Sequence, residues 1–154
     1  MKILCLNGSP RSKNSNSNYF LNKIDKNANI KYLYDDNLEN IVDSILLSNT
    51  LIFSFPLYID GLPCKVLELF EYIDDNFIDI SNKNIYVLCN CGFWEASQNN
   101  VAVDIIKNFS ITNKANYMGS FKIGAGEIIG KCNKKKLYVP VCLPFFRKIK
   151  LFKK

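Results

Sequence analysis

The sequence predicts a doubly wound parallel α/β sheet, because apolar runs of strand length alternate along the chain with segments of helical periodicity. Several of these runs are nearly continuously apolar, which is typical of parallel strands that are buried on both faces. The 154 residues match the length of one ordinary domain. We expect strands at residues 3–6, 30–34, 51–55, 85–89 and 117–123.

The segments between these runs carry the signals of four helices. Asp36 and Glu39 stand at capping-box spacing at the start of an apolar stripe. Pro63 suits the first turn of the next helix, because proline lacks the backbone N–H that this turn leaves unbonded. We expect helices at residues 16–26, 38–46, 62–78 and 102–109.

The net charge of +6 is unevenly distributed along the chain. Residues 131–154 contain nine basic side chains and no acidic one, whereas residues 1–130 are mildly acidic. We therefore predict one domain, with residues 1–130 as its body and residues 131–154 as a basic, atypical C-terminal segment. Pro140 and Pro144 disfavour one continuous helix in this segment. We expect its apolar residues to pack on the sheet or on a partner subunit; the alternatives are an interfacial membrane anchor, since residues 147–154 mix cations with Phe and Leu, and a disordered segment.

Composition and motif absences exclude several classes of function. The acidic body argues against nucleic-acid binding, which requires a basic face on the fold itself. The absence of histidine excludes Ser-His-Asp and Cys-His catalytic groups and histidine metal sites. The six cysteines form no CxxC pair, so we expect no metal site. We also expect no membrane span and a cytoplasmic location, because the thiols are free, no export signal precedes the first strand, and no apolar run reaches roughly 20 residues.

The loop after the first predicted strand is a candidate phosphate-binding site. Residues 7–17 are rich in serine and asparagine and include two cations, Arg11 and Lys13. They lead into a helix, whose first N–H groups and positive dipole attract an anion. The loop lacks the glycine spacing of a Walker or a Rossmann motif. In the alternative interpretation, its serines and asparagines only cap the helix.

Cys5 offers a competing interpretation of the same loop. Together with Arg11 and Ser12 it forms CxxxxxR[ST], the spacing of low-molecular-weight tyrosine phosphatases. In those enzymes a distant Asp-Pro supplies the general acid, and this sequence contains no Asp-Pro. Pro10 also removes one N–H donor from the loop. We therefore expect Cys5 to be a buried strand thiol.

Two further loops are expected at the same edge of the sheet. Residues 56–63, after the third predicted strand, combine apolar and aromatic side chains with Gly61 and would form a wall for a flat ring. The loop after the fourth predicted strand would bring backbone groups and Asn90 to this crevice. Cys89 and Cys91 could form a metal or redox pair, but inert thiols are favoured because no other ligands stand at suitable spacing. A phosphate loop opposite an apolar loop predicts a mononucleotide that carries a ring.

At these residues the sequence resembles the flavodoxin-like superfamily, in particular its NADPH-dependent FMN reductase and multimeric flavodoxin branch. The match is carried by residues 8–17, 55–63 and 90–93. The resemblance implies a three-layer sandwich with a five-stranded parallel sheet in the order 2-1-3-4-5. Members of this branch normally end with a fifth helix, and this sequence departs from the pattern because its basic C-terminal segment stands in that place. It also implies FMN, with the phosphate at Ser9, Arg11, Ser15, Asn16 and Ser17, the ring against Pro56, Leu57, Tyr58 and Gly61, and Asn90, Cys91 and Gly92 at the other edge of the ring. Lys13 is added to this site from its charge alone.

The activity that the resemblance implies is that of an FMN-dependent NAD(P)H oxidoreductase. Such an enzyme passes hydride through flavin N5 to a small acceptor such as a quinone or free flavin. We expect no catalytic side chain, because the cofactor carries the reaction, and this fits a chain without histidine. The alternatives are a flavodoxin-type electron-transfer protein and a flavin-binding fold without turnover. We expect a homodimer or a higher homo-oligomer.

Overall fold

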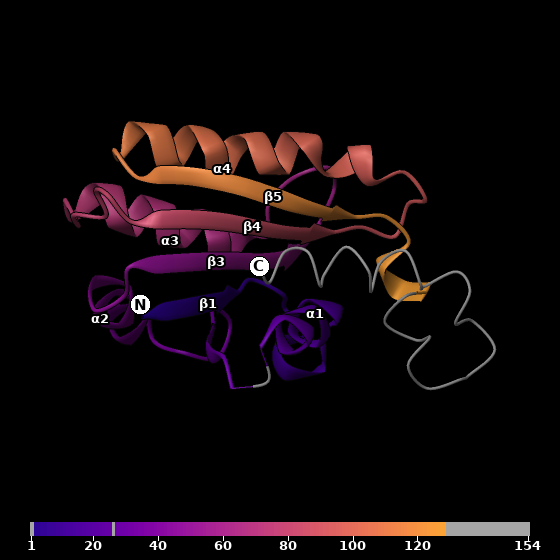
Figure 1. Ribbon diagram of the computed structural model, residues 1–154, viewed down its shortest axis with the longest axis horizontal. Helices are drawn as coiled ribbons and strands as arrows, with labels where there is room; N and C mark the ends of the chain where they lie inside the picture. The colour runs from indigo at the N-terminus through magenta and orange to yellow at the C-terminus, as the bar shows by residue number, and fades with distance from the viewer. Residues whose placement is uncertain (1, 26, 129–154) are drawn as a thin grey trace.

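The computed structural model describes residues 2–25 and 27–128, which form a three-layer α/β sandwich (Figure 1). The central sheet has five parallel strands in the order β2-β1-β3-β4-β5, which confirms the predicted fold class and strand order. The prediction for residues 131–154 lies outside the described residues. The strands are β1 (Ile3–Asn7), β2 (Asn29–Tyr32), β3 (Thr50–Pro56), β4 (Asn84–Asn90) and β5 (Asn116–Ile123).

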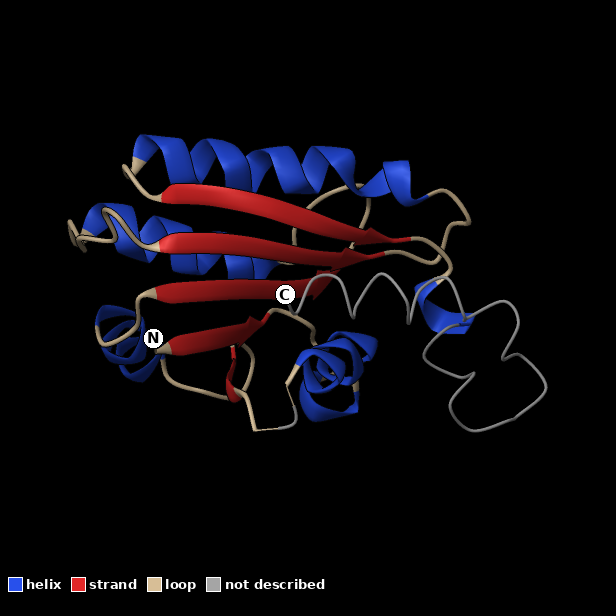
Figure 2. Ribbon diagram, viewed as in Figure 1, coloured by secondary structure: helices blue, strands red, loops and turns tan. Residues whose placement is uncertain are grey.

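Helices connect the strands in the predicted alternation (Figure 2). Pro63 is the N-cap of the third α-helix, so this helix starts two residues later than we expected. The α-helices are α1 (Asn16–Ile24), α2 (Leu38–Leu46), α3 (Cys64–Asp75) and α4 (Asn100–Thr112). Two short 3-10 helices, η1 (Ser12–Asn14) and η2 (Ala96–Asn99), were not predicted from the sequence.

Helix α2 starts at a different cap from the predicted one. Asn37 Oδ1 accepts a hydrogen bond from the Glu39 N–H at 2.8 Å, so Asn37 caps the helix. Asp36 Oδ2 instead accepts a hydrogen bond from the Tyr32 N–H at 2.7 Å. The capping-box prediction for Asp36 was therefore wrong, because this carboxylate stabilises the turn after β2.

The two faces of the sheet have separate apolar cores. Helix α1 covers one face, where Phe20 and Leu21 pack against Cys5. Helices α2, α3 and α4 cover the opposite face, whose core includes Leu4 and Leu6. Successive side chains of a strand point to opposite faces, so Cys5 is directed toward α1 and is only 2% exposed. The structure thus confirms that Cys5 is a buried strand thiol.

The carboxyl ends of β1, β3, β4 and β5 lie at one edge of the sheet (Figure 2). The register pairs Asn7 with Ser54, Pro56 with Asn90, and Asn90 with Ile123. The strand order reverses between β1 and β3, and ligands bind at such a point in open α/β sheets. Among the helices that the structure describes, none is long and apolar enough to cross a membrane.

Candidate functional site

A pocket of about 220 Å³ opens at this edge, between the loops that follow β1, β3 and β4. Eleven of the thirteen residues predicted to bind the cofactor line it. The volume is below the roughly 300 Å³ at which pockets for drug-sized ligands begin, so a mononucleotide would extend beyond the mouth. The lining residues are Ser9, Arg11, Ser15, Asn16, Ser17, Pro56, Leu57, Tyr58, Asn90, Cys91, Gly92 and Glu127.

The first turn of α1 supplies backbone donors to the pocket. Ser15 Oγ caps the helix by accepting a hydrogen bond from the Asn18 N–H at 3.0 Å. The N–H groups of Asn16 and Ser17 have no acceptor among the described residues, as is usual in the first turn of a helix. Both residues line the pocket, so this end of it is suited to an anion.

The serine hydroxyl groups of the loop differ in whether they can still donate a hydrogen bond to a ligand. Ser15 Oγ donates to the Ser12 carbonyl oxygen at 2.6 Å, so its proton is already used. Ser17 Oγ accepts a hydrogen bond from Asn90 Nδ2 at 3.1 Å, and its proton stays available to a ligand. Ser9 Oγ accepts a long hydrogen bond, 3.4 Å, from the Arg11 N–H. Capping therefore accounts for the side chain of Ser15, but not for those of Ser9 and Ser17.

The two cations of the loop lie in different places. Arg11 is exposed and is the one cationic side chain among the described lining residues of the pocket. Lys13 does not line the pocket, and its Nζ lies 5.8 Å from the centroid of the Tyr32 ring, within the range of a cation–π contact. Charge alone placed Lys13 in the predicted site, and the structure brings it to the β2 side of the loop.

The loop after β3 contributes an apolar wall and a tight turn. Tyr58 and Gly61 exchange two backbone hydrogen bonds, of 3.1 and 2.8 Å. Between them Ile59 and Asp60 have positive φ angles of 43° and 58°, as in a type I′ turn. Gly61 therefore closes the turn with an ordinary φ and does not line the pocket, whereas Leu57 does. Gly61 was expected to lie against the ring, and the structure instead places it at the end of this turn, outside the pocket lining.

The loop after β4 is attached to its neighbours through Asn90. This side chain is 4% exposed and donates from Nδ2 to Ser17 Oγ and to the Phe55 carbonyl oxygen, each at 3.1 Å. Asn90 thereby ties the first turn of α1 to the end of β3. Its backbone carbonyl accepts a hydrogen bond from the Leu57 N–H at 2.7 Å. Both donors of the Asn90 amide are occupied, so its contribution to a ligand would come from Oδ1 or from backbone atoms.

The side chain of Cys91 points into the protein. Its Sγ accepts a hydrogen bond from Asn99 Nδ2 at 3.3 Å, while Asn99 Oδ1 accepts one from Cys89 Sγ at 2.9 Å. Burial, and then the charge of Cys91, raise the pKa of the Cys89 thiol. Among residues 2–25 and 27–128, no three histidine, cysteine or acidic side chains are grouped so that they could hold a metal. Cys91 therefore lines the pocket while both thiols of the pair are engaged by a buried amide.

Glu127 lines the pocket but was not predicted. It follows Gly126, where an added Cβ would lie only 2.9 Å from Asn90 Oδ1. The Gly126 N–H donates to the Cys91 carbonyl oxygen at 2.8 Å, which fixes the loop after β5 on the loop after β4. Because the carboxyl ends of parallel strands meet at one edge of a sheet, the position of this loop after the fifth strand is the sequence signal that points to Glu127.

Cys5 does not belong to the pocket, although its spacing from Arg11 allowed that interpretation. Burial, and then the charge of Asp25, raise its pKa to about 12. A nucleophilic cysteine needs a lowered pKa and access to its substrate. The phosphatase interpretation therefore lacks both properties at Cys5.

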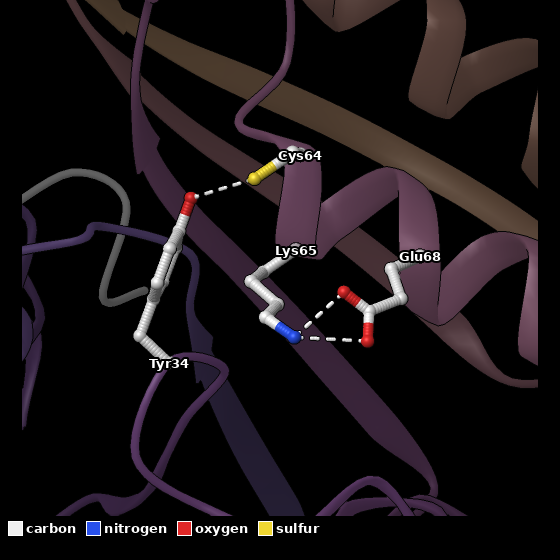
Figure 3. A network of polar contacts seen from close by, with 4 residues as sticks. All are labelled: Tyr34, Cys64, Lys65 and Glu68. Carbon is white, nitrogen blue, oxygen red and sulfur yellow. Dashed lines mark hydrogen bonds and ion pairs between the residues drawn. The ribbon is translucent and has the colours of Figure 1, made fainter.

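A second polar cluster lies at the start of α3 (Figure 3). The Tyr34 hydroxyl and Cys64 Sγ are 3.2 Å apart, and Lys65 Nζ pairs with Glu68 Oε2 at 2.7 Å. Burial, and then the contact with Cys64, raise the pKa of Tyr34 to about 12. Cys64 is the exposed thiol among the four cysteines of the described residues, and none of the cluster lines the pocket.

No protein-family model and no curated protein matches the sequence. Solved structures do match, among them an NADPH-quinone reductase from P. pentosaceus, with a TM-score of 0.73, 14% identity, and coverage of 100% of this chain and 98% of that one. The Trp repressor binding protein from Bacillus subtilis has a TM-score of 0.70 and 22% identity over 80% of this chain and 83% of its own. The chain has a flavodoxin-like fold.

A further neighbour of this flavodoxin-like chain was solved with a ligand. General stress protein 14 from Treponema denticola, in complex with FMN, has a TM-score of 0.68 and 11% identity over 97% of this chain and 99% of its own. These neighbours agree with the branch that the sequence resembles. At such identities the likeness concerns the flavodoxin-like fold.

Proposed function

We propose that the protein binds FMN in the pocket at the carboxyl edge of the sheet and acts as an NAD(P)H-dependent oxidoreductase. The observation that carries the proposal is the polarity of this pocket. One end presents N–H groups at the start of α1 together with Arg11, and the other presents the apolar wall after β3. A mononucleotide with a flat ring has the same two chemistries at its two ends.

The residues of the pocket fit FMN. The N–H groups of Asn16 and Ser17 lack acceptors among the described residues, and a phosphate would supply them. Pro56 and Leu57 are half-buried and offer apolar surface to one face of the ring. The neighbouring structures support the same ligand, because general stress protein 14 was solved with FMN and another neighbour is an NADPH-quinone reductase.

Bound FMN would supply the two-electron redox chemistry. The chain itself would bind the phosphate at the start of α1, orient the ring against Leu57, and exclude water from that face. Tyr58 and Ile59 are exposed beside the pocket, and Phe93 and Trp94 are exposed directly after Gly92. We propose that these apolar side chains receive a small acceptor such as a quinone or free flavin, or a second subunit of a homo-oligomer.

The binding site is tested by titrating FMN into the Arg11→Ala variant. Loss of a charge-assisted contact to a dianion should weaken FMN binding roughly ten- to hundredfold. The matched variant is Lys13→Ala, which removes the other cation of the same loop. Because Lys13 Nζ lies over Tyr32 and outside the pocket, this change should alter the affinity much less. Equal dissociation constants for Arg11→Ala and the unmodified protein would contradict the placement of the phosphate.

Turnover is tested separately from binding. Oxidation of NADH and NADPH is followed with menadione or free FMN as the acceptor, on protein that has been loaded with FMN. Rapid, saturable oxidation supports the oxidoreductase. Tight FMN binding without turnover would instead support an electron-transfer protein or a flavin-binding fold that has no activity of its own.

A further inference from the structure

Asn7, the last residue of β1, has a fully buried side chain that does not line the pocket. Its amide makes three hydrogen bonds, all to the segment between β1 and α1. Oδ1 accepts from the Ser9 N–H at 2.9 Å, and Nδ2 donates to the Ser12 carbonyl oxygen and to Ser15 Oγ, each at 3.2 Å. One side chain thus fixes the beginning, the middle and the end of this loop.

The middle of the loop has a strained backbone. Ser12 has a φ of 43°, in the left-handed region that residues with a Cβ rarely adopt. Its own hydroxyl does not compensate, because the buried Ser12 Oγ has no hydrogen-bond partner among the described residues. The Ser12 carbonyl, in contrast, accepts bonds from Asn7 Nδ2 at 3.2 Å, from Ser15 Oγ at 2.6 Å and from the Ser15 N–H at 3.2 Å. These bonds hold the left-handed turn, and Asn7 is the one donor among them that comes from the sheet.

The end of the loop connects Asn7 to the anion-binding end of the pocket. Ser15 Oγ accepts from Asn7 and also caps α1 through the Asn18 N–H at 3.0 Å. The helix capped in this way begins with the N–H groups of Asn16 and Ser17, which have no acceptor within residues 2–25 and 27–128. The position of these donors therefore depends on a side chain that is anchored in the sheet.

We propose that Asn7 is the positioning residue of the anion-binding loop, and that it sets the loop and the first turn of α1 in the geometry that receives the phosphate of a mononucleotide. The inference rests on the proposed function, because it names how the same pocket selects a phosphorylated ligand. Asn7 makes no side-chain hydrogen bond to the described residues of the loops after β3 and β4. Its removal should therefore affect the phosphate end and spare the ring end.

The test compares FMN with riboflavin, which has the same ring but no phosphate. For the unmodified protein, the ratio of the two dissociation constants measures what the phosphate contributes. Asn7→Ala should weaken FMN binding at least tenfold and change riboflavin binding less than threefold, so that the ratio falls. Asn7→Asp should act in the same direction, since a carboxylate still accepts from Ser9 but cannot donate to Ser12 or Ser15.

The matched control is Asn99→Ala, which removes another fully buried amide at the same edge of the sheet. Asn99 bonds to Cys89, Cys91 and Ala96, on the ring side of the pocket. This variant should therefore leave the ratio of the two dissociation constants unchanged, even if both affinities fall. A ratio that falls equally in Asn99→Ala and in Asn7→Ala would overturn the assignment, because the effect would then be general.

A rescue variant keeps the proposal testable if Asn7→Ala is poorly folded. Ser12→Gly removes both the Cβ that disfavours the left-handed φ and the unsatisfied hydroxyl. In the Asn7→Ala background it should restore at least part of the FMN affinity and of the melting temperature. Failure of this rescue, together with an unchanged ratio in Asn7→Asp, contradicts the role of Asn7. An unmodified protein that binds neither flavin contradicts the proposed function itself.

Discussion

Gly8 brings the loop after β1 into contact with α3, and we expect Gly8→Ala to destabilise the protein. An added Cβ would lie 2.5 Å from Val66 Cγ2 and 3.3 Å from Phe55 Cβ. Both neighbours are fully buried, so neither side chain can turn toward solvent. Overpacking of this kind costs about 1–3 kcal/mol. The lower entropy of the unfolded alanine chain offsets about 0.4–1 kcal/mol, so the free energy of unfolding should fall by about 1–2 kcal/mol.

Urea unfolding of a double-mutant cycle measures this contact. Val66→Ala removes the methyl group that the new Cβ would meet, so Gly8→Ala should cost less in that background, by about 0.5–3 kcal/mol. Gly92→Ala is the control, because an added Cβ there has no atom within 4 Å, so only the entropy effect remains and the free energy of unfolding should rise by about 0.4–1 kcal/mol. If Gly8→Ala is no more destabilising than Gly92→Ala, or if its cost simply adds to that of Val66→Ala, the steric reasoning is refuted.

Two further predictions concern the thiols. Burial raises the pKa of Cys5 from 9.0 to about 12. The folded state therefore keeps a neutral thiol at a pH where the unfolded chain ionises, and the free energy of unfolding falls as the pH rises from 9 toward 12. At pH 10 the free energy of unfolding should be about 1.4 kcal/mol lower on this account. In Cys5→Ala it should therefore fall less between pH 8 and pH 10 than in the unmodified protein. An equal fall in the two proteins would contradict the prediction. Iodoacetamide should modify Cys64 in the folded protein well before Cys5, Cys89 and Cys91, because those three are buried; peptide mass spectrometry before and after unfolding checks the order.

The fold and most of the pocket follow from patterns that are local in the sequence. Continuous apolar runs identify parallel strands, and the rule that carboxyl ends of such strands share an edge brings the loops after β1, β3 and β4 together. Residue types in those loops then indicate chemistry, as at Arg11 and Leu57. Eleven of the thirteen expected residues accordingly line one pocket.

The remaining details depend on contacts that spacing does not encode. Lys13 is a cation in the correct loop, but its ammonium group is attracted by the ring of Tyr32, which belongs to another strand. Asp36 has the spacing of a cap for α2, but its carboxylate accepts a hydrogen bond from the backbone of β2, and Asn37 caps the helix instead. Glu127 enters the pocket because Gly126 lets two loops approach closely. Each outcome is decided by a partner that is distant in sequence or by steric access.

Buried amides hold the pocket at both of its ends. Asn7 is hydrogen-bonded to the loop after β1, and Asn99 to Cys91 in the loop after β4. Asn90 joins the first turn of α1 to the end of β3. A buried amide that satisfies several backbone and side-chain groups fixes their geometry, because leaving any of them unpaired costs about 1–3 kcal/mol.

Exposed apolar side chains that follow the pocket residues Tyr58 and Gly92 in the sequence have the opposite character. The side chain of Ile59 is fully exposed in a left-handed conformation, and Trp94 is 73% exposed. A β-branched residue in this conformation costs roughly 1–2 kcal/mol, which the exposed side chain does not regain by packing. The pocket interior, which buried amides hold in place, thus suits a bound phosphate and ring, while Ile59 and Trp94 offer exposed apolar surface. We expect substitutions in the interior to change the affinity for FMN, and substitutions at Ile59 or Trp94 to change which acceptors are reduced, as measured by kcat/KM for menadione against free FMN. Equal losses for both acceptors in Trp94→Ala would argue against this division of roles.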